Sequence, residues 1–476
     1  MLKSADGGLR NIPFPIDDPE RIPSKRYYDQ EFYDLEVEHF WPHVWQMACR
    51  LEQIPEPGDW IEYNNVGKSV LVVRTNDGIK AYHNACRHRG VPIAGGTTVG
   101  CSHASAHGNC SKKGFVCPFH GWRWNMDGEN TLVYAEQIFS ERQLDGDDLD
   151  LIECRVETAM GCAFINFDDD APSLRETLGP IVDNLEEHGL HKVRAEWQYG
   201  TVLPANWKIA MEAFMEGYHV LQTHPQLYHN NPELYSGRYG NKGVEDVPTA
   251  PTPTNLREIV DATVRGMQLL SDGMAGMIHQ KEVDIAKSVP IDDLPQDDPA
   301  KAMEMWGGMV AAEITRQLRE RGEDVSDIIE KKQSHPINAV EFLFPHWFVL
   351  PTFTSFSSYR IRPLGPESCF FEIWSLTQFP EGEEPEPVME PTVLPYDSPD
   401  FPPIPRQDYA NIPIQQQGMH ADGFEFMRLS HQMEGMISNY QRILDGYLKG
   451  VPHENMLPAI HDLGGNFDGK ILDQDF

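Results

Sequence analysis

The sequence predicts an α+β protein in which a small antiparallel β domain precedes a larger domain of mixed helices and strands. Its 476 residues are too many for one ordinary hydrophobic core, so two or three domains are expected. From Trp45 to about Phe167, short runs of β-forming residues are separated by Gly, Asn and Asp, as in strands joined by tight turns. After that point helical segments alternate with aromatic, β-branched runs, which predicts the mixed domain.

These changes along the chain predict the domain boundaries. Residues 1–44 form an N-terminal segment with a helix, and residues 45–167 form the β domain. Residues 168–476 form the larger domain, with a helical insertion at residues 255–335 that is rich in methionine. Methionine packs adaptably, so this insertion is either a lid over a bulky apolar substrate or an ordinary helical layer.

Three further segments of the larger domain bear on its site. Ala205–Leu221 has the pattern of one helix, and Gly382–Arg406 has the Pro- and Glu-rich composition of an irregular surface loop. Pro413–Leu448 predicts a long C-terminal helix.

Composition excludes several classes of protein. The 39 Lys and Arg against 73 Asp and Glu give a formal charge of −34, which disfavours nucleic acid and anionic membranes as partners. The longest apolar runs are far shorter than the ~20 residues of a membrane span, and Met1–Arg10 has no signal-peptide core. We therefore expect a soluble cytoplasmic protein whose redox partner has a basic docking face.

Two short motifs form a candidate metal site. Cys86 and His88 stand in Cys-x-His spacing, and Cys117 and His120 stand in Cys-x₂-His spacing, each motif followed by glycine. Two thiolates and two imidazoles can hold either one zinc ion or the two irons of a Rieske cluster. Structural zinc usually takes two Cys from one arm and two His from the other, whereas each arm here offers one of each, which favours the 2Fe–2S cluster.

The connection between the two arms is long. Between His88 and Cys117 lie 117 − 88 − 1 = 28 residues. They contain four further potential ligands: Cys101, His103, His107 and Cys110. A second metal site or a Cys101–Cys110 disulfide is one reading, and a solvated loop that happens to hold these residues is the other.

A second candidate metal site lies downstream. His219 and His224 are five residues apart, which is roughly 140° away from a shared helix face, so both reach one metal only if the helix bends or ends between them. Pro225 indicates such an ending. Two histidines and one carboxylate on one face of Fe(II) leave positions open for O₂.

Both motifs, in this order, resemble those of the Rieske non-haem iron ring-hydroxylating oxygenases, in their α (catalytic) subunits. The resemblance implies that His219 and His224 are iron ligands and that Asp408, eight residues before Gln416, is the third. Asp422 and Glu425 are poorer alternatives. It also implies a helix-grip (START-like) catalytic domain, an antiparallel sheet over a long C-terminal helix, behind the Rieske domain.

The resemblance gives Glu216 a role between the two sites. The family's acid at this position bonds the first iron-ligand His and a cluster His of the neighbouring subunit, here His120, and so carries electrons between them. A homotrimer follows, because a closed ring lets every cluster serve a neighbour. The sequence departs from the family pattern at two positions. It has Glu216 where aromatic dioxygenases carry Asp, and Ala213 where many members carry Asn. These two differences leave the substrate class open. Phe214 lines the pocket or packs in the core.

The activity implied is hydroxylation of a hydrophobic, aromatic or polycyclic substrate by O₂, as mono- or cis-dihydroxylation. Electrons come from NAD(P)H through a separate reductase, with or without a ferredoxin, and a β subunit is compatible with the sequence. A monooxygenase or demethylase acting on a non-aromatic substrate shares the same ligands. Two rivals remain from other classes: a helix-grip ligand-binding protein with a degenerate metal site, and an electron-transfer Rieske protein.

Overall fold

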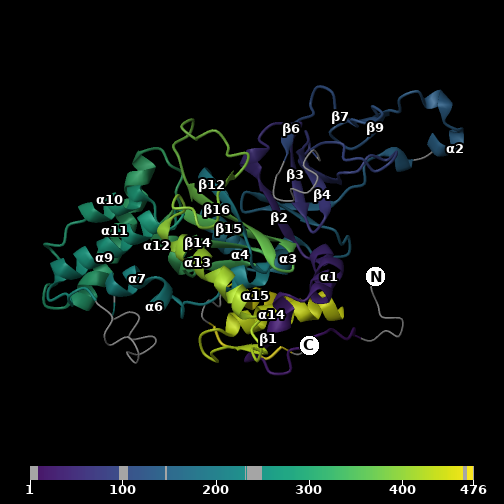
Figure 1. Ribbon diagram of the computed structural model, residues 1–476. Helices are drawn as coiled ribbons and strands as arrows, with labels where there is room; N and C mark the ends of the chain where they lie inside the picture. Colours follow the sequence, from purple (N-terminus) through teal and green to yellow (C-terminus); the bar gives the residue numbers. More distant parts are fainter. Residues whose placement is uncertain are drawn as a thin grey trace.

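The computed structural model describes residues 9–95, 106–144, 147–230, 232, 249–464 and 469–474. Figure 1 shows the N-terminal β-rich part beside a larger part built on one twisted sheet, with a helical layer at the far side of that sheet. The predicted α+β architecture, with an antiparallel β domain followed by a mixed domain, is confirmed.

The N-terminal β domain consists of three small antiparallel sheets. The first has the order β5-β4-β3-β6, the second β7-β8-β9, and the third β10-β11-β2. Glycines at tight turns and short strands of two to seven residues explain the alternating texture of the sequence. The strands are β2 (Gln46–Arg50), β3 (Asp59–Asn65), β4 (Lys68–Arg74), β5 (Ile79–His83), β6 (His107–Asn109), β7 (Phe115–Val116), β8 (Arg123–Trp124), β9 (Asn130–Leu132), β10 (Arg155–Ala159) and β11 (Cys162–Asn166).

The larger domain is built on a six-stranded sheet of order β13-β14-β15-β16-β12-β17. Its pairs are antiparallel except β12 with β17, which are parallel. The strands are β12 (Arg194–Leu203), β13 (Glu341–Leu343), β14 (Trp347–Pro351), β15 (Phe356–Gly365), β16 (Ser368–Thr377) and β17 (Thr392–Val393). A separate pair, β1 (Arg21–Pro23) with β18 (Phe426–Arg428), ties the N-terminal segment to the C-terminal part.

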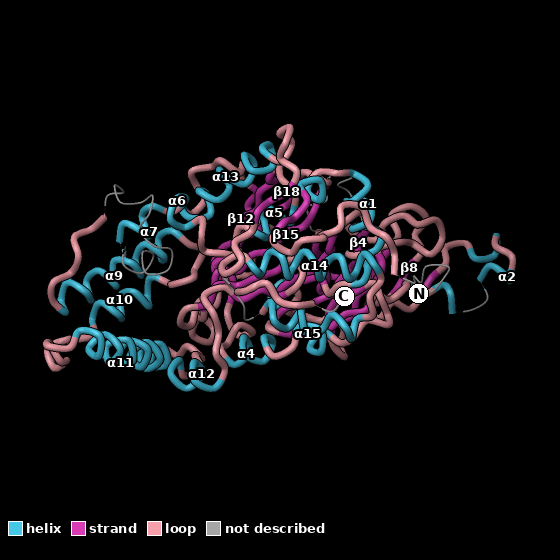
Figure 2. The backbone as a smooth tube through the Cα atoms, turned by 90° about the horizontal axis from the view of Figure 1, so that it is seen from below, coloured by secondary structure: helices cyan, strands magenta, loops and turns pink. Residues whose placement is uncertain are grey.

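Helices surround this sheet. α5 and α13 contact its central strands, and α14 with α15 packs below them (Figures 1 and 2). The helices are α1 (Gln30–His39), α2 (Glu141–Leu144), α3 (Leu174–Leu178), α4 (Ile181–Glu187), α5 (Trp207–Glu212), α6 (Val220–Thr223), α7 (Pro225–Asn230), α9 (Leu256–Gly273), α10 (Gln280–Ser288), α11 (Pro299–Glu320), α12 (Ile328–Ser334), α13 (Pro403–Gly418), α14 (Gly435–Lys449) and α15 (His453–Leu463).

The helical insertion forms a layer with a core of its own. Apolar residues of α9, α10, α11 and α12, including Val283, Trp306 and Ile314, are buried together and apart from the main core. Figure 2 shows these four helices at one end of the molecule, beside α6 and α7. Among the described residues, no helix is long and apolar enough to span a membrane.

The two faces of the large sheet differ in chemistry because side chains alternate along each strand. On β15, Arg360 and Arg362 point to one face, where both pair with Glu372 of β16 at 2.7 and 3.3 Å. Arg360 also donates to the carbonyl oxygens of Met47 and Ala48 in β2. This face therefore holds the β domain, and the opposite face is left for the site.

Two helix predictions were wrong in detail. The helix expected over Ala205–Leu221 is broken after Glu212, and a new short helix begins at Val220. The helix expected over Pro413–Leu448 is two helices, and the first of them, α13, already begins at Pro403 inside the expected loop. Proline in the first helical turn loses no hydrogen bond, because the N–H groups there have no partner within the helix.

Candidate active site and cluster site

Two matched turns present Cys86, His88, Cys117 and His120. The N–H of Gly90 donates to the carbonyl of Cys86 at 2.8 Å, and the N–H of Gly121 donates to that of Cys117 at 3.0 Å. Gly90 and Gly121 have φ of 74° and 75°, in the left-handed region that glycine adopts without a Cβ clash. Each turn thus places one Cys and one His on a compact loop.

The four side chains sort into a thiol pair and an imidazole pair. Burial and the neighbouring Cys117 thiol raise the pKa of Cys86, and the two cysteines are 4% and 2% exposed. The rings of His88 and His120 lie 4.7 Å apart between centroids. The His88 Nδ1 atom is buried without a hydrogen-bond partner. A buried nitrogen without a hydrogen-bond partner is explained if it binds a metal ion.

The chemistry of these donors fits a 2Fe–2S cluster. Two sulfur and two nitrogen donors suit such a cluster with the histidines on one iron. Elsewhere among the described residues, the ligand atoms of His219, His224 and Asp408 all lie within 4.8 Å of one another.

Aromatic side chains surround the histidine side of the cluster site. Trp122 stacks on His88 at 5.0 Å with an interplanar angle of 8°, and Phe139 meets the same ring edge-on. The cysteines face the core, while His120 is half-buried and the neighbouring Phe119 is 56% exposed. The histidines therefore form the side of the site nearest the surface.

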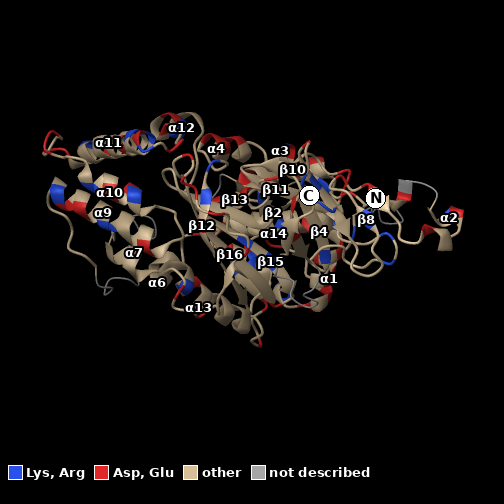
Figure 3. Cartoon of the chain, turned by 90° about the horizontal axis from the view of Figure 1, so that it is seen from above, with Lys and Arg blue, Asp and Glu red and all other residues tan. Residues whose placement is uncertain are grey.

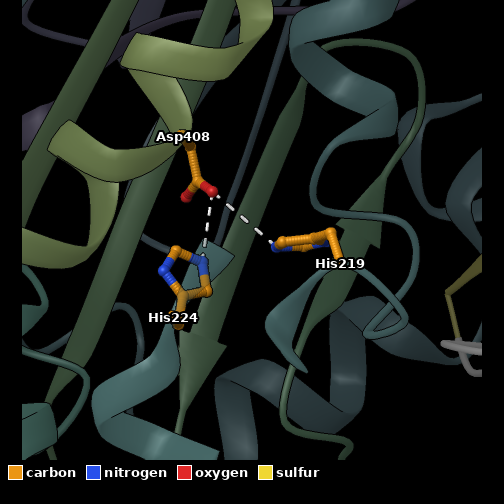
Figure 4. Close-up of side chains that lie close together, drawn as sticks. All are labelled: His219, His224 and Asp408. Atoms are coloured by element: carbon orange, nitrogen blue, oxygen red, sulfur yellow. Dashed lines mark ion pairs between the residues drawn. The ribbon is translucent and has the colours of Figure 1, made fainter. Parts of the chain in front are cut away.

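The second site brings two histidines and one aspartate together from separate segments (Figure 4). His224 Nε2 lies 3.1 Å and His219 Nε2 lies 3.7 Å from the same oxygen, Oδ1 of Asp408. His224 and Asp408 are 3% and 4% exposed at their side chains, whereas His219 is 25% exposed. One face of the triad is thus more open than the others.

The break in the helix explains how both histidines reach one point. α5 ends at Glu212, His219 is the residue before α6, and His224 follows α6 directly. His224 has φ −118° and ψ 61°, outside the helical region, immediately before Pro225. This departure removes the angular offset that a continuous helix would impose on residues five apart.

Each histidine is oriented through its other ring nitrogen. His219 Nδ1 lies 2.7 Å from Oε1 of Glu216, and His224 Nδ1 lies 2.8 Å from Oε1 of Gln407. Both acceptors fix the tautomer with hydrogen on Nδ1 and leave Nε2 free to bind metal. Gln226 donates to the same oxygen of Gln407 at 2.9 Å and holds that side chain in place. The donor set and its orientation fit a mononuclear Fe(II).

The two sites lie far apart within one chain. In both Figure 1 and Figure 2 the hairpins of the cluster site, β7 to β9, are at the opposite end of the molecule from α6 and α7. In both views strands of the large sheet lie between the two sites.

Comparison with known proteins decides the family. Residues 183–450 match the family model described as the ring hydroxylating alpha subunit (catalytic domain), and residues 44–137 match the Rieske [2Fe-2S] domain. The chain belongs to the ring-hydroxylating oxygenase alpha subunits. The prediction of the family, of its Rieske and catalytic domains, and of its cofactors, a 2Fe–2S cluster and mononuclear iron, is confirmed.

Similar proteins come from two groups of this family of O₂-incorporating oxidoreductases. The chain is 32% identical over 261 residues to the large oxygenase component of the naphthalene 1,2-dioxygenase system of Pseudomonas aeruginosa, covering 54% of each chain. It is 27% identical over 207 residues to the carnitine monooxygenase oxygenase subunit of Escherichia coli (strain K12), covering 43% of this chain and 52% of that one. The matched stretch thus spans about half the length of these relatives.

Solved structures share the fold over nearly the whole chain. A naphthalene 1,2-dioxygenase with indole in its active site superposes with a TM-score of 0.58 at 19% identity, covering 97% of this chain and 98% of that one. A quaternary ammonium Rieske monooxygenase gives 0.57 at 15% identity, covering 92% and 99%. Family members with such different substrates share this framework.

The long connection in this oxygenase chain holds two of its four extra donors outside the described residues, Cys101 and His103. His107 lies in β6 and its Nδ1 is 3.6 Å from Oε1 of Glu390. Cys110 is 4% exposed and packs in the core around the cluster site, where burial raises the pKa of its thiol to about 11. His107 thus lies beside an acidic side chain, and Cys110 is part of the hydrophobic core.

Sequence reasoning missed the residues that orient the histidines from elsewhere in this oxygenase. These residues are Gln407 and Gln226. The position of Gln407 immediately before the proposed third ligand is the one local signal that could have indicated its role. The alternatives Asp422 and Glu425 are exposed and lie outside the triad.

Proposed function

We propose that this chain is the oxygenase component of a multicomponent system that hydroxylates a hydrophobic, aromatic or polycyclic substrate with O₂. Electrons are taken from NAD(P)H by a separate reductase, with or without a ferredoxin. The observation that carries the proposal is the convergence of two histidine Nε2 atoms on one Asp408 oxygen, with both Nδ1 atoms held by acceptors.

We assign the site residues accordingly. Cys86, His88, Cys117 and His120 hold the 2Fe–2S cluster within residues 45–167. His219, His224 and Asp408 hold the mononuclear iron within residues 168–476. The orphan His88 nitrogen beside the His120 ring supports the first set, and the 4.8 Å grouping supports the second.

The chain's own side chains prepare this site for oxygen chemistry. When bound, the cluster supplies single electrons and the iron supplies open coordination positions for O₂. Glu216 and Gln407 keep hydrogen on each Nδ1, so neither imidazole turns away from Asp408. Phe214 is buried, with its ring 4.9 Å from that of Phe348 and 5.3 Å from that of Tyr359, and supports an apolar wall that excludes water.

The assembly that we propose is a homotrimer in which Glu216 bonds His219 of its own chain and the partner subunit's His120. The separation of the two sites within one chain supports transfer between chains. A cavity of about 250 Å³ lies beside Glu216, lined by Ala213, Phe424 and Glu434 among others, and leaves this carboxylate accessible to a partner side chain. The acidic side chains that attract a basic redox partner are spread over both domains (Figure 3).

A second candidate function is monooxygenation or demethylation of a non-aromatic substrate. Glu216 favours it, because aromatic dioxygenases resemble this chain but carry Asp there, and one similar protein is a carnitine monooxygenase. The ligands are equally suited to both reactions, so product analysis decides between them.

Metal content tests the proposal directly. Anaerobically purified chain is expected to hold about three iron and two acid-labile sulfide, the sum of one Rieske cluster and one mononuclear site. Asp408→Ala is expected to lose the single iron and to keep the cluster's visible spectrum. Zinc in place of iron, without sulfide, would return Cys86, His88, Cys117 and His120 to a structural role.

A further inference from the structure

The carboxyl group of Glu212 is buried near the candidate iron site. Glu212 is the last residue of α5 and is 5% exposed. The hydroxyl of Tyr27 donates to this carboxylate and lies 3.0 and 2.9 Å from its two oxygens, and the side-chain amide of Gln441 donates to Oε1. Both donors are neutral. Among the described residues, no base forms an ion pair with Glu212, whereas the acids around it are paired.

Glu212 is the odd acid in a buried cluster of charged side chains. Arg26 pairs with Asp445 at 2.5 Å, and Lys208 pairs with Glu36. The side chains of these four residues are at most 4% exposed. Two bases thus balance two acids, and an ionised Glu212 would add a negative charge without compensation. Burial of such a charge is unfavourable, so a bound proton on Glu212 is favoured.

The same surroundings keep this proton exchangeable near neutral pH. Burial raises the pKa of Glu212 to about 7, while the hydrogen bonds from Gln441 and Tyr27 and the charges of Lys208 and Arg26 act in the opposite direction. The hydrogen bonds and charges that favour the carboxylate therefore nearly balance its burial. Glu212 can gain or lose a proton in this pH range.

Glu212 also lies at the wall of the cavity beside Glu216. This cavity of about 250 Å³ is lined by Glu212, Glu216 and Glu434, among others. A water molecule takes up about 30 Å³ in the liquid, so the cavity has room for several. Solvent there can bring a proton to Glu212 or remove one. In the described part of the chain, the further titratable or charged groups that face Glu212 or this cavity are Tyr440 of α14, Glu216, Arg428 and Glu434.

Glu216 connects this cavity to the candidate iron ligands. Its Oε1 atom lies 2.7 Å from Nδ1 of His219. Glu212 and Glu216 are four residues apart and are joined by a turn, in which the N–H of Met215 donates to the carbonyl of Glu212 at 3.0 Å. In a protein interior, a unit charge about 12 Å away changes the proton affinity of a buried group about tenfold. An electron gained at the iron site therefore increases the proton affinity of Glu212.

The proposed reaction has a use for such a proton. Hydroxylation by O₂ consumes protons and electrons in equal numbers. The cluster supplies the electrons singly, whereas the protons come from solvent. In the proposed trimer the partner subunit lies over this cavity during electron transfer, so a proton already held on the cavity wall remains available.

We propose that Glu212 takes up a proton from the solvent of this cavity when the iron site gains an electron, and returns it to the cavity when that electron is consumed. The electron comes from the reduced cluster, and an O–H bond forms on the Glu212 carboxylate. On return the O–H bond breaks and the proton passes to water, while Tyr27 and Gln441 donate to the carboxylate that remains. This inference rests on the proposed function, and Glu212 acts through the charge of the site without touching the iron.

The reduction potential of the mononuclear iron tests the inference, because a coupled proton makes that potential depend on pH. Redox titrations of the metal-replete enzyme are followed by the electron paramagnetic resonance of the ferric iron at several pH values. In the wild type, reduction is expected to become about tenfold less favourable as pH rises through the range in which Glu212 loses its proton. Glu212→Gln cannot titrate and is expected to lose this dependence. A wild-type profile in Glu212→Gln would overturn the inference.

Glu341→Gln is the matched control. Glu341 of β13 is 1% exposed and burial raises its pKa to about 7 as well, but it does not line the cavity beside Glu216. This variant is expected to keep the wild-type profile. If Glu341→Gln removes the pH dependence as fully as Glu212→Gln does, the dependence does not belong to the cavity and the inference is wrong.

Tyr27→Phe keeps the carboxyl group and provides the test if Glu212→Gln does not fold. It removes a donor that stabilises the charged form of Glu212, so the fall in potential is expected to begin at higher pH. Infrared spectra of the carboxylic acid carbonyl follow the protonation of Glu212 in the same samples, and this titration should move in the same direction. A potential profile that stays where it is in the wild type would contradict the inference.

The iron and sulfide content of the same preparations separates this inference from the proposed function. A filled iron site whose potential does not depend on Glu212 refutes the inference alone. An empty iron site refutes the proposed function and, with it, the inference.

Discussion

Gln407 accepts the Nδ1 hydrogen of His224 at 2.8 Å and immediately precedes Asp408, which lies 3.1 Å from the other nitrogen of the same ring. Two neighbouring residues of α13 thus contact the two nitrogens of one imidazole ring. Because His224 is in the segment after α6, this contact joins two parts of the chain about 180 residues apart and sets the geometry of the triad.

Gln407→Ala is therefore expected to weaken iron binding about 10- to 100-fold, as loss of a hydrogen-bonded orienting residue does in other metal sites. Iron content after dialysis against a chelator measures this, with sulfide as the internal standard for the cluster. Gln417→Ala, at an exposed position of the same helix, is the control and should retain iron. Equal iron retention in both variants would show that Gln407 does not orient His224.

Mixed assemblies test transfer between chains. A Cys117→Ala chain is expected to lack the cluster, and an Asp408→Ala chain to lack the iron. If electrons pass from one subunit to the next, co-assembled chains regain O₂-dependent oxidation of the reduced cluster, which neither variant supports alone. The visible absorbance of the cluster measures it. Mixtures that stay as slow as the separate variants would indicate transfer within one chain.

Glu372 holds two buried arginines at the junction of the two domains. Glu372→Leu removes the carboxylate that pairs with the buried side chains of Arg360 and Arg362, so it is expected to destabilise the protein by about 3–5 kcal/mol. The midpoint of urea unfolding measures this loss. Glu313→Ala, which breaks the exposed ion pair between Glu313 and Arg316 on α11, is expected to leave the midpoint nearly unchanged. Similar midpoints for the two variants would contradict the prediction.

His346 makes stability depend on pH at the same junction. It accepts from the N–H of Met47 at 3.0 Å and lies 3.1 Å from the carbonyl of Ile361, so it bridges both domains as a neutral ring. Burial, together with the charges of Arg360 and Arg362, lowers its pKa to about 3. The unfolded chain takes up a proton near pH 6.5 and the folded chain does not. The contribution is therefore complete above pH 6.5 and is lost as pH falls towards 3.

The comparison that isolates this contribution is with His346→Gln, whose amide can make the same two hydrogen bonds without titrating. From pH 7 to pH 4 the wild type is expected to lose more unfolding free energy than this variant does. Chemical denaturation at several pH values measures both curves. Parallel curves would mean that His346 does not carry the pH dependence.

The cluster motifs and the order of the domains could be predicted from the sequence because they are local. A Cys-x-His or Cys-x₂-His turn closed by glycine brings its two donors together within five residues, whatever the rest of the chain does. The short strands of residues 45–167 and the end of the helix between His219 and His224 are local in the same sense. Glycine permits the tight turns between the strands, and proline ends the helix.

The extent of α13 and the surroundings of the triad depended on the tertiary structure. Prolines 402, 403 and 405 looked like a loop, but they occupy the helix start, where packing of Ile404 and Tyr409 against the sheet stabilises a helix that local preference does not favour. Gln407 and Gln226 meet only because this helix lies across the segment after α6.

By itself, the sequence determined the family, the two metal-binding motifs and the α+β order of the domains, because each of these features depends on residues that are close together in the chain. Only the tertiary structure decided which side chain orients His224. Gln407 lies on α13 and Gln226 on α7, and each is an ordinary residue in its own segment. Their contacts with each other and with His224 depend on side-chain direction and burial, which are set by long-range packing.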